Sequence, residues 1–307
     1  MRLAAALGIV YVVWGSTDLG IDVAERALPP LLMLGIRFLI AGALLYAWAR
    51  RRGEVAAERP GLRQWRAAAL VGFLLLVVET GAVAFSEKHV PTGMAALIVA
   101  SVPLFMALID RAFFGIRLAP LAAVGILAGL AGVGLLAGGG GSLSPVWALV
   151  LLGGALAWAA GSAYARVAPL PGGSVLSAAM QMLTAGATLV VISAAKGDLA
   201  HVHAAALGLT SIGSIAYLVG FGSILAYTAY GWLLRNAPTP LLSTYAYVNP
   251  AVAVLLGWLL AGERLGEREL VAGLVVVGSV ALILLARRPQ PPRGPKVRAE
   301  APATVAG

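Results

Sequence analysis

Long apolar stretches alternate with short polar breaks along almost the whole chain. Each stretch is about 20 residues long, the length that an α-helix needs to cross about 30 Å of hydrocarbon. Charged residues, prolines and glycines fill the breaks. We therefore expect transmembrane helices over 3–20, 29–49, 66–85, 91–113, 119–137, 145–167, 173–195, 205–234, 238–261 and 267–286.

This pattern predicts an all-α integral membrane protein with ten transmembrane helices. The segments between the stretches are short, so no soluble domain is expected between the helices. Residues 287–307 hold charged residues and prolines but almost no large apolar residues. We expect them to form a disordered cytoplasmic tail.

The composition supports a membrane protein. Of the 307 residues, 60% are apolar and 11% are charged, whereas soluble domains hold about 25% charged residues. The chain has no cysteine, and His201 and His203 have no third ligand near them in the sequence. We therefore expect neither a metal site nor a cofactor.

The basic residues are distributed unequally between the two sides of the predicted helices. Sixteen of the 22 Lys and Arg residues fall on the side of the two termini and five on the other, while Arg37 lies inside a helix. Basic loops stay in the cytoplasm, so we expect a multi-pass inner-membrane protein with both termini cytoplasmic. The bias also explains the net charge of +9 without a nucleic-acid partner.

An internal repeat divides the chain into two halves, 1–137 and 145–286. Pro91-Thr92 and Pro103 recur as Pro238-Thr239 and Pro250, at a constant offset of 147 residues. Each half holds five predicted helices, an odd number, so the second half enters the membrane from the opposite side. Inverted repeats of this kind are typical of alternating-access transporters, whose site lies between the repeats near the middle of the bilayer.

At these positions the sequence resembles the drug/metabolite transporter superfamily, in its ten-helix form with two EamA-type halves. The resembling features are Trp14-Gly15-Ser16, Arg37 to Ala41, Pro103, Pro250 and Gly262-Glu263-Arg264-Leu265. Ile116 departs from the family pattern after Gly115, where an acidic residue is usual. The resemblance implies export of metabolites, and within the superfamily the chain is similar to the YddG-type amino-acid exporters.

Two charged residues inside predicted helices are candidates for function, because charge in a bilayer is costly and is kept where it is used. Arg37 and Glu79 are both expected about 9–11 Å from the outer face, from the rise of 1.5 Å per residue. They form either a structural ion pair or a site at which Glu79 responds to a proton or substrate. Asp110 lies near a helix end, and we expect it to be solvated or to snorkel toward solvent.

Aromatic and hydroxyl side chains supply candidates for substrate binding. An indole offers a flat apolar surface and one donor, and hydroxyls can bind an ammonium or a carboxylate group. Aromatic residues also gather at membrane interfaces without binding anything, and that reading stays open for each ring. The candidates are Trp14, Ser16, Thr17, Glu79, Trp158, Ser162, Tyr227, Tyr245, Tyr247 and Asn249.

Two features of the predicted helices leave alternatives open. Tyr245 and Asn249 share one face of their helix and Tyr247 lies on another, and one of these faces is expected to line a cavity. Pro103 and Pro250 interrupt their helices near mid-depth, where they serve either as hinges or as tolerated kinks.

The leading hypothesis is a carrier, and not an enzyme, that exports small metabolites through a central cavity between the repeats. Aromatic or other neutral amino acids are the first candidates. Drugs, or sugar and nucleotide derivatives, are alternatives, and a multi-pass membrane enzyme is an alternative of another class. The expected partners are a small-molecule substrate and the lipid bilayer, with the chain a monomer or a weak dimer.

The charge bias makes a testable prediction about topology. A reporter fused after Ala286 should be cytoplasmic, and a reporter inserted between Gly138 and Gly141 should be external. Paired alkaline phosphatase and green fluorescent protein fusions would measure both positions. An external carboxyl end would contradict the ten-helix arrangement.

Overall fold

The computed structural model describes residues 2–86, 89–90, 95, 98–137, 144–202, 207–261 and 266–286. Every regular element in these ranges is helical. The predicted tail, 287–307, lies outside them. The predicted all-α class is therefore confirmed for the part of the chain that the structure describes.

The helices of the first half follow the predicted apolar stretches closely. They are α1 (Arg2–Glu25), α2 (Pro30–Arg51), α3 (Glu54–Glu58), α4 (Leu62–Gly72), η1 (Phe73–Glu79), α5 (Thr80–Ser86), α7 (Val102–Phe114) and α8 (Pro120–Ala137). The elements α4, η1 and α5 join into one continuous helix. Of the predicted span 91–113, only part is described.

The second half repeats this order. Its helices are α9 (Pro145–Ala165), α10 (Ser174–Ala195), η2 (Asp198–His201), α11 (Leu209–Tyr217), η4 (Leu218–Tyr227), α12 (Thr228–Asn236), α13 (Thr239–Leu242), α14 (Tyr245–Ala261) and α15 (Glu267–Leu285). Here α11, η4 and α12 join into one helix. In both halves a π-helical segment, η1 or η4, widens the middle of the long helix, a distortion that is frequent at functional sites.

Six helices of the described residues are long and apolar enough to cross a bilayer. They are Pro30–Arg51, Leu62–Ser86, Pro145–Ala165, Ser174–Ala195, Leu209–Asn236 and Thr239–Leu256. Shorter apolar helices occupy Arg2–Thr17, Pro120–Leu135 and Leu270–Leu285. Lengths and composition of this kind establish a multi-pass membrane protein.

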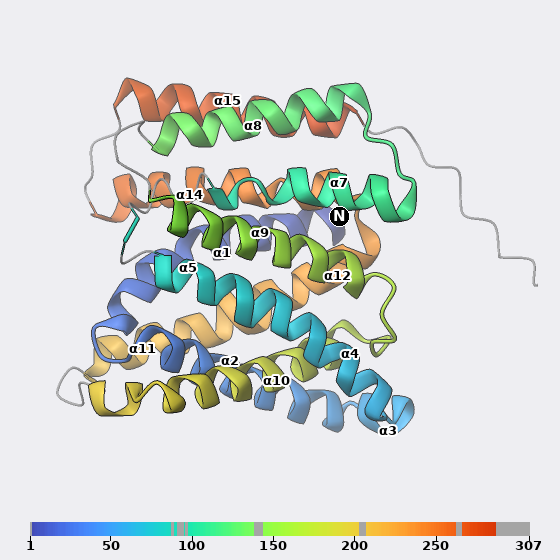
Figure 1. Ribbon diagram of the computed structural model, residues 1–307, viewed down its shortest axis with the longest axis vertical. Coiled ribbons are helices and arrows are strands. Elements are labelled where there is room, and N and C mark those ends of the chain that lie inside the picture. Colours follow the sequence, from blue (N-terminus) through green and yellow to red (C-terminus); the bar gives the residue numbers. More distant parts are fainter. Residues whose placement is uncertain are drawn as a thin grey trace, which may run out of the picture.

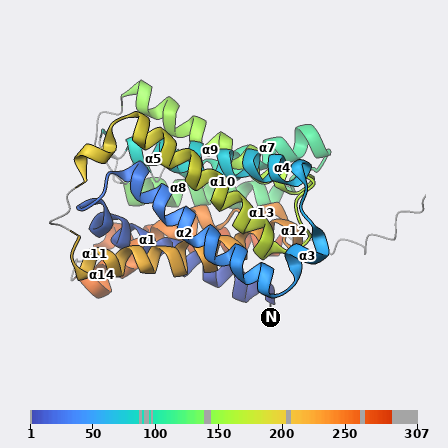
Figure 2. The same cartoon turned by 90° about the horizontal axis from the view of Figure 1, so that it is seen from below.

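The helices lie side by side in a stack (Figure 1). The pair α8 and α15 forms one outer layer, α7 and α14 lie beneath it, and α2 packs against α10 at the far side of the stack. Figure 2 shows the bundle from the side of α2 and α10. We call the end of the bundle at which α1 begins the N-terminal end; α3 lies at the same end (Figure 1).

Small residues allow the helices to approach closely in the α2–α10 pair. A Cβ atom added to Gly186 would lie 2.8 Å from the backbone nitrogen of Leu39, and one on Gly42 would lie 2.9 Å from that of Leu183. Backbones this close exclude any side chain between them. Close packing matters in a membrane because lipid is as apolar as the helices, and the hydrophobic effect does not drive the helices together.

The two predicted hinge prolines differ in their setting. Pro103 lies in the first turn of α7, where a missing N–H group is tolerated because that group has no partner within the helix. Pro250 lies inside α14, where it removes a helical hydrogen bond. A role for either as a hinge stays a prediction.

The α2–α10 contact predicts a strong effect of one methyl group. Gly186→Ala should lower the stability of the purified protein by about 1–3 kcal/mol, because the added atom meets backbone that cannot move aside. Gly153→Ala in α9 is the matched control, since a Cβ there meets nothing within 4 Å. Thermal unfolding in detergent measures both variants, and equal midpoints would show that the helices are not in close contact.

Candidate functional site

Four aromatic side chains from four helices meet in the interior of the bundle. Trp14 of α1, Trp158 of α9, Tyr230 of α12 and Tyr245 of α14 form what we call the ring cluster. The centroid of the Trp14 ring lies 5.6 Å from Trp158, 5.3 Å from Tyr230 and 5.4 Å from Tyr245. The Trp158–Tyr230 and Tyr230–Tyr245 centroids are 5.2 Å and 5.6 Å apart. Edge-to-face and tilted contacts at these distances are favourable for aromatic rings.

The polar atoms of the ring cluster bond to groups of the protein. Trp158 donates from Nε1 to the Tyr230 hydroxyl at 2.8 Å, and Ser162 Oγ lies 2.6 Å from the same oxygen. Trp14 donates from Nε1 to the Gly222 carbonyl oxygen at 3.1 Å. The rings are therefore held in defined orientations and are not free to reorient one at a time.

A second polar group lies beside the cluster. Tyr227 of η4 donates to Gln181 Oε1 at 2.7 Å, and Gln181 donates to Ser177 Oγ at 2.9 Å. The Tyr227 and Tyr230 ring centroids are 6.4 Å apart. A cavity of about 20 Å³ adjoins these residues and is lined by Ser177, Gln181, Tyr227 and Tyr230, which is room for about one water molecule.

Glu79, at the end of η1, contributes a negative charge near the rings. It lies within electrostatic reach of Tyr230 and Tyr245. The π-helical turn of η1 packs against α9, where a Cβ added to Gly154 would lie 3.5 Å from the Glu79 Cα. The structure therefore places Glu79 near the ring cluster, and a role for it in substrate binding stays a prediction.

Arg37 lies elsewhere. It is buried, with 6% of its surface exposed, and donates from Nε to Ser223 Oγ of η4 at 2.7 Å. In the described part of the chain no ion pair joins it to Glu79. The predicted pairing is therefore not observed, because α2 packs against α10 and η4 whereas η1 packs against α9 and α10. Similar depth in the membrane does not make two residues neighbours.

Ser16 and Thr17 bond within and beside α1. Ser16 donates to the Val13 carbonyl at 2.8 Å and contacts the Tyr217 hydroxyl. Thr17 donates to the Trp14 carbonyl at 2.7 Å. Both lie one turn or less from Trp14, but neither bonds to the side chain of a ring-cluster residue.

The two faces of α14 point to different surroundings. Tyr245 joins the ring cluster, whereas Tyr247 is fully buried against α8, where a Cβ added to Gly129 would lie 2.5 Å from its ring. Asn249 adjoins α1 through its backbone, since its carbonyl lies 3.0 Å from a Cβ added to Gly15. Its Oδ1 is buried without a hydrogen-bond partner among the described residues. The face of Tyr245 is therefore the one that meets the rings.

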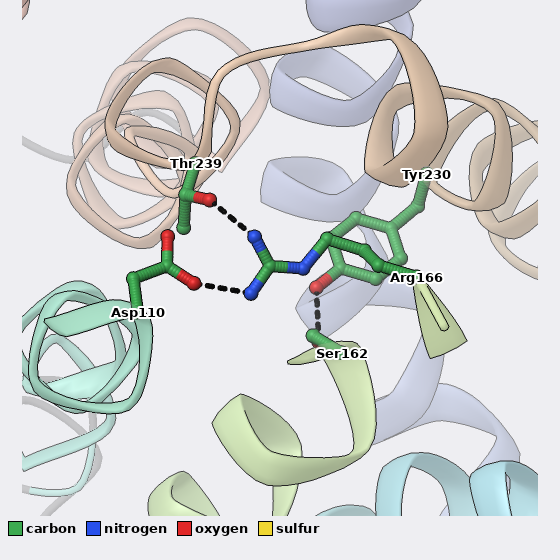
Figure 3. Close-up of polar contacts among 5 residues, drawn as sticks. All are labelled: Asp110, Ser162, Arg166, Tyr230 and Thr239. Atoms are coloured by element: carbon green, nitrogen blue, oxygen red, sulfur yellow. Dashed lines mark hydrogen bonds and ion pairs between the residues drawn. The ribbon is translucent and has the colours of Figure 1, made fainter. Parts of the chain in front are cut away.

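An ion pair closes the bundle one turn further toward the N-terminal end. Arg166, which follows α9, binds the Asp110 carboxylate of α7 and donates from Nη1 to Thr239 Oγ1 of α13 at 2.8 Å. Its guanidinium also lies 4.7 Å from the centroid of Phe114. Figure 3 shows Asp110 and Thr239 on one side of Arg166, with Ser162 and Tyr230 beside it on the other. We call Asp110, Arg166 and Thr239 the clasp.

The clasp corrects the expectation for Asp110. Sequence analysis expected this residue to be solvated or to snorkel toward solvent because it is near a helix end, but only 4% of its surface is exposed. The left-handed Gly115 ends α7, and the chain then folds back. The contacts of α7 with α9 and α13 bury Asp110, whereas the residues that follow it in α7 are exposed.

Sequence analysis missed Tyr230 and Arg166, and one spacing connects them to residues that it identified. Trp158, Ser162 and Arg166 follow one another at intervals of four residues, so they lie on one face of α9. The first two bond to Tyr230, and the third forms the clasp. The four-residue spacing of Trp158, Ser162 and Arg166 is a signal that was available in the sequence, whereas no comparable pattern pointed to Tyr230.

The clasp predicts energetic coupling between its charges. Asp110→Asn and Arg166→Gln should each destabilise the protein, by up to about 3 kcal/mol, because either change leaves a largely buried charge unpaired. The double variant should be more stable than the sum of the two losses predicts. Thermal unfolding of the four proteins in detergent measures the coupling. Strictly additive losses would show that the two side chains do not interact.

Comparison with known proteins agrees with this architecture. A protein of known crystal structure superposes with a TM-score of 0.77 over 92% of this chain and 97% of its own, at 21% sequence identity. At that identity the likeness establishes the fold. YedA of Escherichia coli (strain K12), an uncharacterized inner membrane transporter, is 42% identical over 289 residues, covering 94% of this chain and 92% of that protein.

A more distant relative carries a more specific name. A probable amino-acid metabolite efflux pump of Escherichia coli (strain K12) is 25% identical over 281 residues, covering 88% of this chain and 91% of that protein. The EamA-like transporter family matches the chain twice, over residues 2–138 and 145–285. The predicted resemblance is confirmed, and family and relatives indicate a transporter of the inner membrane and not an enzyme. The chain belongs to the EamA-like transporter family, within the drug/metabolite transporter superfamily.

Proposed function

We propose that this protein exports small neutral metabolites, first of all amino acids, by alternating access through a site at the ring cluster. The observation that carries the proposal is the contact between Trp14 and Trp158, one from each half of the chain, with ring centroids 5.6 Å apart. A site between two repeats can be opened to either side of the membrane by rocking one repeat against the other. One chain contributes every residue of this site, so it is complete in a monomer or a weak dimer.

The pattern of helix contacts supports an inverted arrangement of two five-helix repeats. Equivalent helices pack on each other in the pairs α2–α10 and α8–α15. The remaining contacts come in matching pairs: α1 of the first half packs on α14 and η4 of the second, and its counterpart α9 packs on their counterparts, α7 and η1. A two-fold relation between the halves, 1–137 and 145–286, predicts such matching contacts, because it carries each helix onto its counterpart.

The charges at the two ends support cytoplasmic termini. The described residues at the N-terminal end include a cluster of arginines at the end of α2 and the start of α4. These arginines are Arg50, Arg51, Arg52, Arg59, Arg63 and Arg66. Basic residues are retained on the cytoplasmic side during insertion. The N-terminal end is then the cytoplasmic end, and the clasp lies between the ring cluster and the cytoplasm.

The chemistry of the ring cluster suits a small molecule with an apolar part. Four rings supply apolar surface, while the Tyr230 hydroxyl and the two indole N–H groups supply polar contacts. Glu79 adds a negative charge that can attract an ammonium group. The name of the efflux pump to which the chain is related favours amino acids over other metabolites.

The packing of the cluster supports an occluded state. The rings contact one another, and the adjoining cavity of about 20 Å³ holds no more than a water molecule. Substrate would enter from the cytoplasmic end only after the clasp has broken and α7 has moved away from α9 and α13. Opening and closing this end would alternate with opening at the other end, with Pro250 in α14 as a candidate hinge.

Transport measurements test the proposal. Proteoliposomes that contain only the purified protein should take up or release labelled phenylalanine or leucine with saturation. Trp14→Ala and Trp158→Ala should each weaken transport about twofold to tenfold, because each ring contributes about 0.5–1.5 kcal/mol beyond its buried area. Tyr230→Phe should weaken it too, since it removes the oxygen that the Trp158 indole N–H and Ser162 contact.

The matched control is Trp48→Ala in α2, a tryptophan whose side chain is 46% exposed and lies outside the ring cluster. It should transport normally. All variants are compared at equal amounts of reconstituted protein. Unchanged transport in both Trp14→Ala and Trp158→Ala would reject the ring cluster as the substrate site.

A further inference from the structure

A pocket lies beside the clasp at the N-terminal end of the bundle. Its volume is about 560 Å³, within the range of small-molecule sites. It is formed by α7, α8, α13 and α15, and its lining includes Asp110 and Thr239 of the clasp. Figure 3 shows Asp110 and Thr239 across the Arg166 guanidinium from Ser162 and Tyr230, so Arg166 lies between these two pocket residues and Tyr230 of the ring cluster.

One carboxylate oxygen in this pocket is available to a ligand. Asp110 is almost fully buried, and its Oδ1 receives the Arg166 guanidinium. Its Oδ2 accepts no hydrogen bond from any residue that the structure describes. A buried carboxylate gains from further donors, because hydrogen bonds to ionised groups are about twice as strong as those between neutral groups.

A positive group lines the same pocket. Arg117, in the segment that follows α7, is exposed and lines the pocket. Among the described residues its guanidinium has no hydrogen-bond or ion-pair partner. The pocket is thus lined by a carboxylate whose Oδ2 accepts no hydrogen bond from a described residue and by an exposed guanidinium that water can solvate.

The remaining walls are largely apolar. Pro103, Leu118, Ile126, Leu241 and Ile283 contribute to them. A molecule that fits such a pocket carries an ammonium group for Asp110, a carboxylate for Arg117, and an apolar part for these walls. That is the charge pattern of a free neutral amino acid with an apolar side chain.

We infer that this pocket is a first binding site for zwitterionic amino acids on the cytoplasmic side, where the substrate ammonium competes with Arg166 for Asp110. The inference rests on the proposed export of amino acids. By binding Asp110, the substrate stabilises the form in which Arg166 is released and the way to the ring cluster is open. A free amine lacks the contact with Arg117, so the pocket selects for the carboxylate.

Binding of three related probes to the purified full-length protein in lipid-free detergent tests this inference. L-Phenylalanine has both charges, phenethylamine lacks the carboxylate, and 3-phenylpropanoate lacks the ammonium group. Arg117→Gln should weaken binding of phenylalanine and 3-phenylpropanoate about twofold to fivefold, within the range expected for an exposed charge pair. It should leave phenethylamine binding unchanged. Titrations followed by thermal unfolding give the three affinities.

Two further variants sharpen the comparison. Arg111→Gln, an exposed arginine in the last turn of α7 outside the pocket, is the matched control and should change none of the affinities. Asp110→Asn should weaken phenylalanine and phenethylamine but not 3-phenylpropanoate. Should that variant fail to fold, the Arg117→Gln comparison still decides, because Arg117 is exposed and has no described partner to lose.

Several outcomes would overturn the inference. Equal losses for phenylalanine and phenethylamine in Arg117→Gln would do so, as would no loss at all. Tighter competition by glycerophosphoethanolamine than by phenylalanine would assign the pocket to a lipid headgroup. Transport measurements distinguish the two proposals. If phenylalanine is transported but Arg117→Gln leaves the relative affinities of the three probes unchanged, the pocket is rejected and export stands. If binding depends on Arg117 but no phenylalanine is transported, export is rejected and the pocket stands.

Discussion

An unpaired polar group in hydrocarbon costs several kcal/mol, and much of this structure follows from that cost. Helices satisfy their own backbone groups, and all regular elements of the described residues are helical. The same constraint acts on the side chains. Each polar atom of Trp14, Trp158 and Tyr230 has a partner inside the protein, and Arg37 is held by Ser223.

Trp158, Ser162 and Arg166, spaced four residues apart along α9 and its C-terminal end, satisfy their polar groups at two neighbouring places. Trp158 and Ser162 bond to Tyr230, and Arg166 bonds to Asp110 and Thr239. A shift of α9 therefore changes the ring cluster and the clasp together. Such a shift needs new partners for every group that it separates, and a substrate with an ammonium and a carboxylate group can supply some of them. Substrate binding and opening of the bundle would then be coupled through the same hydrogen bonds.

The two π-helical segments fit this picture. A π-helical turn leaves the regular i to i−4 pattern, and η1 and η4 do so in matching helices of the two halves. One presents Glu79 near the ring cluster, and the other ends at Tyr227. Their positions beside the rings associate the distorted backbone with the proposed substrate site, whereas the helices of the tightly packed α2–α10 pair are regular.

The sequence by itself determined the membrane class, the family and the positions of the helices along the chain, because the length of an apolar stretch and its flanking charges report on the bilayer. It also identified Trp14, Trp158, Ser162 and Tyr245, which are of types that suit a binding site. Only the tertiary structure decided which side chains meet. Hydropathy gives the depth of a residue in the membrane but neither the direction in which it points nor the helix that lies opposite. Sequence analysis could therefore not foresee that Arg37 bonds to Ser223 and not to Glu79, or that Asp110 is buried and paired with Arg166. Nor did the sequence position of Tyr230 indicate that this residue contacts the other three rings of the cluster.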